Sequence, residues 1–76
     1  MQYEPPFRIV EAQVARAFEI AVNYFERKHG FVCHEEAVSI ISEIESIRRS
    51  GVRHPLVLAN KAIAVLERRA PEPRAA

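Results

Sequence analysis

The sequence has a single cysteine, Cys33, and no long run of hydrophobic residues. One cysteine cannot form a disulfide within the chain, and such low usage is typical of proteins from a reducing compartment. No stretch approaches the roughly 18 apolar residues that a membrane-spanning helix needs. The first residues have neither the basic region nor the apolar region of a secretory signal. We therefore expect a cytoplasmic protein without contact to a membrane.

Aspartate is absent, and glycine occurs only at positions 30 and 51. Such a chain offers few residues from which to build a catalytic pocket, and it has no glycine-rich phosphate or dinucleotide motif. Cys33 precedes His34, but neighbours in sequence seldom face each other, and no third residue is evident to orient them. We therefore expect no enzymatic activity, no cofactor and no small-molecule substrate.

Three histidines and the cysteine are candidate metal ligands, but their spacing matches no established zinc pattern. His29, Cys33 and His34 fall at one predicted helix joint, whereas His54 falls at the next. A helix of about 17 residues separates the two joints by roughly 25 Å. We therefore expect no metal site within one chain, and interpret these side chains as helix-end and packing residues.

Charge of neither sign dominates, since eleven Lys and Arg residues face ten Glu residues, a formal net charge of +1. This balance produces no overall field that would attract the protein to nucleic acid or anionic lipid. Only local clusters of charge remain as candidates for such contacts.

The 76 residues suffice for one domain, and 49% of them are hydrophobic, as in globular proteins. Gly30 and Gly51 are typical helix stops, and Pro55 is a typical helix start. These positions predict helices at about 6–29, 34–50 and 55–69. The expected fold is an all-α, three-helix bundle, with a single helical domain at 1–70 and a flexible C-terminal tail at 71–76.

The apolar faces of the predicted helices differ in width. The second helix has one narrow apolar stripe, whereas the third is apolar over most of its circumference. The first helix is roughly 36 Å long, which is too long for the two shorter helices to cover all of its apolar face. A chain this short also buries only about 60% of the surface that its unfolded form exposes, so its core is marginal. We therefore predict a homodimer or another partner protein on the surplus apolar surface, whose residues would be Ile9, Ile20, Tyr24, Val57, Leu58, Ala62 and Val65.

The sequence thus favours a small, non-enzymatic protein–protein interaction module with an accessory, regulatory or inhibitory role. The alternative is a small nucleic-acid-binding regulator that uses the basic connector 48–54. Its cationic side chains would contact phosphates, and they are Arg48, Arg49, Arg53 and His54.

Overall fold

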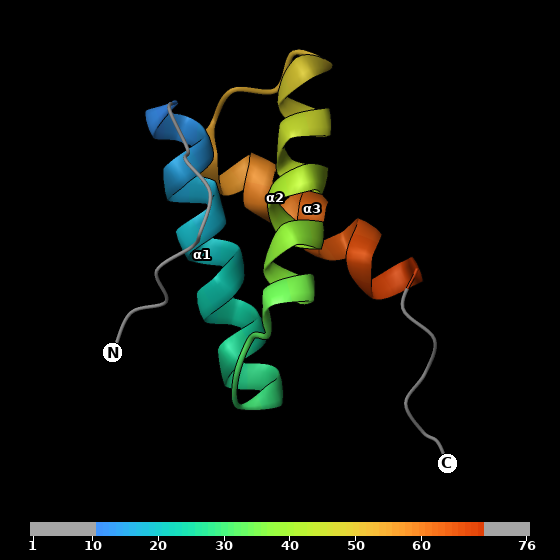
Figure 1. Ribbon diagram of the computed structural model, residues 1–76. Helices are drawn as coiled ribbons and strands as arrows, with labels where there is room; N and C mark the ends of the chain where they lie inside the picture. The colour runs from blue at the N-terminus through green and yellow to red at the C-terminus, as the bar shows by residue number, and fades with distance from the viewer. Residues whose placement is uncertain (1–10, 70–76) are drawn as a thin grey trace.

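Three α-helices form the protein in a computed structural model that describes residues 11–69 (Figure 1). α1 is Ala12–His29, α2 is His34–Arg49 and α3 is Pro55–Arg69. Residues 11–69 contain no strand, so the predicted all-α three-helix bundle is confirmed. The predicted tail at 71–76 lies outside the described residues.

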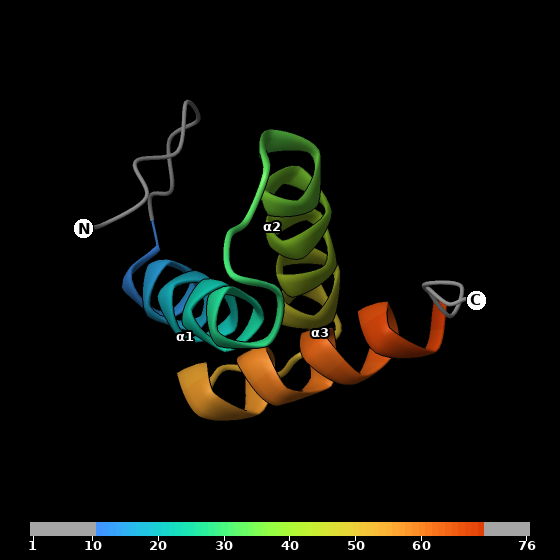
Figure 2. The same ribbon diagram turned by 90° about the horizontal axis from the view of Figure 1, so that it is seen from below.

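α1 and α2 run antiparallel, and α3 crosses one side of this pair (Figures 1 and 2). Each helix contacts both of the others. One side of α3 therefore packs on α1 and α2, and its other side is turned away from both helices (Figure 2).

α1 is shorter than the predicted range 6–29. Glu11 has extended backbone angles (φ −84°, ψ 131°), so the helix begins at Ala12, while residues 6–10 lie outside the described part. The side chain of Glu11 does not cap the helix but accepts two hydrogen bonds from Arg48 in α2, each 2.9 Å long. At 18 residues and about 1.5 Å per residue, α1 is about 27 Å long. This is shorter than the roughly 36 Å expected from the sequence.

The predicted helix ends at the two glycines are confirmed. Gly30 has φ +96° and donates its backbone N–H to the carbonyl of Glu26. Gly51 has φ +118°, again in the left-handed region that a residue with Cβ rarely adopts. At the start of α3, His54 accepts the backbone N–H of Leu56 through Nδ1 at 3.2 Å, as expected of a helix cap.

The core combines small residues with a few large aliphatic ones. The largest fully buried side chains are Ile40, Ile44 and Leu58. Burial of each contributes about 1.5–3 kcal/mol to folding. Five alanines have no exposed surface at all and permit close approach of the helices; they are Ala17, Ala21, Ala37, Ala59 and Ala62.

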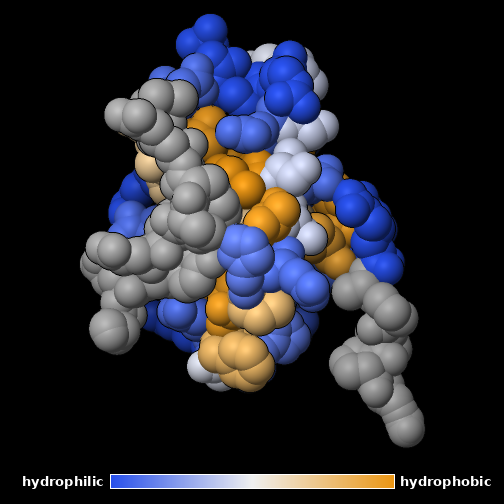
Figure 3. All heavy atoms as spheres, in the orientation of Figure 1, coloured by the Kyte–Doolittle hydropathy of each residue, from blue (hydrophilic) through white to orange (hydrophobic). Residues whose placement is uncertain are grey.

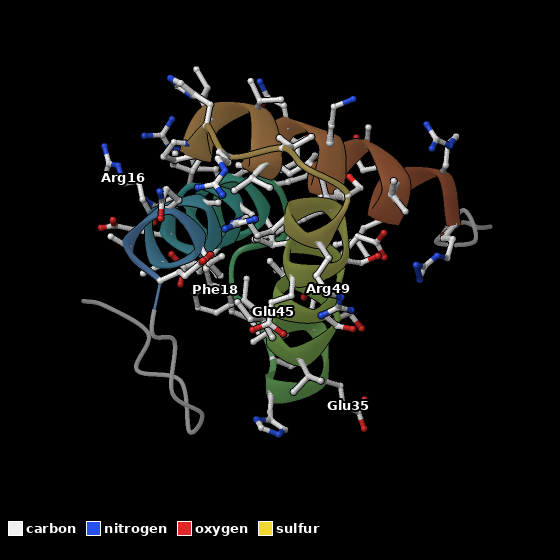
Figure 4. All side chains as sticks on the ribbon, turned by 90° about the horizontal axis from the view of Figure 1, so that it is seen from above. Arg16, Phe18, Glu35, Glu45 and Arg49 are labelled. Carbon is white, nitrogen blue, oxygen red and sulfur yellow. The ribbon has the colours of Figure 1, made fainter. Side chains whose placement is uncertain are left out.

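On the side of the α1–α2 pair opposite α3, hydrophobic residues are visible along the seam between the two helices (Figure 3). Phe18 lies on this side and is almost completely buried (Figure 4). None of the three helices is long and apolar enough to cross a membrane.

Candidate interaction surface

The structure corrects the predicted partner surface at two positions of α3. Leu58 and Ala62 were expected on its outer arc, but both are fully buried in the core of the chain. α3 turns the arc containing Leu58, Ala59, Ala62 and Ile63 towards α1 and α2. Ile9, the first residue of the predicted surface, lies outside the described residues.

Of the two predicted residues of α1, Ile20 and Tyr24, only Tyr24 has a described bond to α3. Ile20 is half-buried and packs against the core. Tyr24 donates its hydroxyl to Oε2 of Glu67 at 2.6 Å, and Lys28 donates to the same oxygen. Tyr24 therefore helps to hold α3 on α1.

This junction also shifts the pKa values of its three polar groups. The hydrogen bond from Lys28, followed by that from Tyr24, lowers the pKa of Glu67 below its ordinary value. The bond to Glu67 raises the pKa of Lys28, and the same carboxylate raises the pKa of the Tyr24 hydroxyl. All three groups stay in their ordinary protonation states near neutral pH, which maintains the junction.

The two large hydrophobic residues of α3 that are exposed lie near its start. Leu56 is 50% exposed and Val57 is 40% exposed. Val57, Lys61, Ala64 and Arg68 follow one another at spacings of four, three and four, so they form one line along the helix. All four are exposed, and Val65 beside them is half-buried. We call Leu56, Val57, Lys61, Ala64 and Arg68 the outer face of α3.

The charge on this outer face has one sign. The only carboxylate of α3 is that of Glu67, which binds Tyr24 and Lys28. Within residues 11–69, no carboxylate pairs with Lys61, Arg68 or the preceding Arg53. Nitrogen-tipped side chains accordingly project from the side of α3 turned away from α1 and α2 (Figure 4). The outer face is therefore both aliphatic and cationic.

The basic connector predicted as a nucleic-acid site is only partly free. Arg48 is held by Glu11 through two hydrogen bonds, with 21% of its side chain exposed. His54 caps α3 through Nδ1. Arg49 and Arg53 are exposed and have no carboxylate partner among the described residues. Two of the four predicted side chains thus serve the fold itself.

The candidate metal ligands are not gathered into a site in the described part of the chain. No three His, Cys or Glu side chains there could share a metal ion. His29 stacks on Phe25 with ring centroids 5.8 Å apart, and its Nε2 lies 3.9 Å from Glu36. Cys33 is exposed and precedes α2 without a side-chain capping bond.

Sequence reasoning missed Leu56, Lys61 and Arg68 as residues of one surface. Leu56 has the helical spacing of the buried residues Ala59 and Ile63, so it was expected to be buried with them. Arg68 was explained as a cation that complements the dipole at a helix C-terminus. The available signal was the spacing of Val57, Lys61, Ala64 and Arg68 in a helix with one glutamate.

A three-helix architecture does not assign a function, because unrelated activities occur on the same small folds. No protein-family model matches the chain, and no curated protein or solved structure shows significant similarity to it.

Proposed function

We propose that the protein is a non-enzymatic protein–protein interaction module that binds its partner through the outer face of α3. The observation that carries this proposal is the exposure of Leu56 and Val57 at 50% and 40% on a helix whose other large hydrophobic residues are buried or half-buried. Exposure of these two aliphatic side chains to water is unfavourable, and their burial by a partner would stabilise the complex. The role that we propose for the module is accessory, regulatory or inhibitory.

The nucleic-acid alternative has weaker support. Arg48 would have to leave Glu11 before it could contact a phosphate, and that exchange removes two charge-assisted hydrogen bonds. Arg49 and Arg53 remain available for phosphate contact. The balanced overall charge adds no long-range attraction to DNA or RNA. Exposed Leu56 and Val57 also have little to gain from a phosphate backbone.

Co-purification from host cells tests the proposal with a matched pair of variants. Val57 of α3 and Val38 of α2 are exposed to almost the same extent, 40% and 41%. Val57→Asp is expected to remove the co-purifying partner, whereas Val38→Asp is expected to retain it. Nuclease treatment before elution separates protein partners from those held by nucleic acid.

Equal retention by both variants would refute the role of the outer face. A partner that disappears on nuclease treatment would instead support the connector, and a mobility shift with random duplex DNA that weakens in Arg49→Ala and Arg53→Ala would establish it. Self-association of the chain stays a prediction. Light scattering during gel filtration at several protein concentrations measures it directly.

A further inference from the structure

We infer that the partner of the outer face of α3 is an acidic amphipathic helix of another protein. This inference rests on the proposed function and names the chemistry of the partner. It is carried by the order of side chains along α3 and by the sign of their charge.

Apolar and cationic side chains alternate along one line of the helix. Val57 and Ala64 are separated by Lys61, and Arg68 follows Ala64. A helix lying beside this line can place apolar residues over Val57 and Ala64 and carboxylates near Lys61 and Arg68. Ala64 has only a Cβ, so the two helices can approach closely there. Leu56 widens the apolar contact at the start of α3.

The dimensions fit a helix of similar length. α3 has 15 residues, which is about 22 Å at 1.5 Å per residue. Its outer face begins at Leu56 and ends at Arg68, so it extends over almost the whole helix. A partner helix of about four turns would cover it. Contact along one helix of this size is typical of a weak, reversible interaction.

The charge of the face argues against a second copy of the chain as the occupant. A two-fold symmetric contact presents the same patch from both subunits. It would bring Lys61 and Arg68 of one copy near the same two cations of the other. The only carboxylate of α3, on Glu67, already binds Tyr24 and Lys28. Like charges brought together without a counter-ion oppose association.

Peptide binding tests the inference directly. The probe is a fluorescent, end-capped helical peptide of about 15 residues with leucines on one face and glutamates beside them, matching α3 in length. One control peptide replaces its glutamates with lysines, and another replaces its leucines with glutamines. A labelled random DNA duplex is the fourth probe. Fluorescence anisotropy measures the affinity of the full chain for each at about 50 mM and about 500 mM NaCl.

Matched variants locate the binding face. Val57→Asp is expected to weaken binding of the acidic leucine peptide at least about tenfold, because it removes an aliphatic contact and adds repulsion. Val38→Asp adds the same charge on α2 and should have little effect. Arg68→Ala is expected to weaken binding about two- to fivefold. Arg27→Ala, which removes an exposed arginine from the last turn of α1, should leave it unchanged.

Binding of the acidic leucine peptide alone, reduced by salt and by the α3 variants, supports the inference. Equal binding of the lysine peptide, or tighter binding of the duplex, overturns it. Self-association that Val57→Asp abolishes would identify a second copy as the occupant and overturn it as well. If no peptide binds while Val57→Asp still removes the host partner, this inference fails and the proposed function stands. Circular dichroism of each variant confirms that the helices are intact.

Discussion

Replacement of Leu58 by alanine is expected to destabilise the protein far more than the same replacement at Val57, its neighbour. Leu58 has no exposed surface and belongs to the core with Ile40 and Ile44, whereas Val57 is 40% exposed. Truncating a buried leucine removes its hydrophobic burial and leaves a cavity, at a cost of about 2–5 kcal/mol. A substitution on an exposed helix face changes stability by only about 0.5 kcal/mol or less.

The loss at Leu58 is large relative to the stability of so small a protein. At about 0.05–0.15 kcal/mol per residue, 76 residues give a free energy of unfolding of about 4–11 kcal/mol. A cost of about 3 kcal/mol would then lower the melting temperature by roughly 12–24 °C. Val57→Ala should shift it by about 4 °C or less.

Urea unfolding followed by circular dichroism measures the free energy of unfolding of both variants. An equal dependence of this free energy on urea concentration would confirm that they share one unfolded state. Leu58→Met, which conserves volume, should cost less than about 1.5 kcal/mol and keeps the comparison possible if the alanine variant does not fold. Equal effects of Leu58→Ala and Val57→Ala would refute the orientation of α3. The proposed binding face would then have to be abandoned with it.

Substitutions at three further positions test local features of the fold. His54→Ala should cost about 0.5–2 kcal/mol in urea unfolding because it removes the cap of α3, whereas His54→Asn should restore most of the loss. Glu67→Gln should reduce the urea midpoint at neutral pH, and the difference from the parent chain should shrink in acid. The pKa of the Glu67 carboxyl is lowered in the folded protein, so the carboxylate stabilises the fold above its ordinary pKa of 4.5. This stabilisation is lost as the pH falls through the lower pKa of the folded protein. A constant difference down to pH 2 would contradict that assignment. Gly30→Ala should cost about 1 kcal/mol through backbone strain alone, since nothing lies within 4 Å of the added Cβ, and thermal unfolding without any loss would argue against the left-handed conformation.

The helix boundaries were accessible from the sequence because the residues that set them act locally. Glycine adopts a positive φ without a steric cost, and proline fixes φ and needs no hydrogen bond at its nitrogen. Gly30, Gly51 and Pro55 accordingly lie where the sequence predicted them to interrupt or begin a helix. The start of α1 was missed because no such residue marks it, and Glu11 is instead drawn to a residue 37 positions away.

The orientation of α3 was not accessible in the same way. When apolar residues surround most of a helix, periodicity does not decide which arc is buried. The structure buries the arc that contains Leu58, Ala59, Ala62 and Ile63, so Leu58 turns inward and Leu56 turns outward. Contacts with distant residues accompany this orientation: Glu67 binds Tyr24 and Lys28 of α1, and Arg69 binds Glu43 of α2 at 2.6 Å. Such pairings cannot be identified from the spacing within one helix.

The five fully buried alanines limit which substitutions related sequences could accept while keeping this fold. Larger side chains at these positions would push the helices apart, whereas the aliphatic residues around them can exchange sizes among themselves. A distantly related chain would therefore be recognised less by its large hydrophobic residues than by small residues at the spacings of the five, which are Ala17, Ala21, Ala37, Ala59 and Ala62.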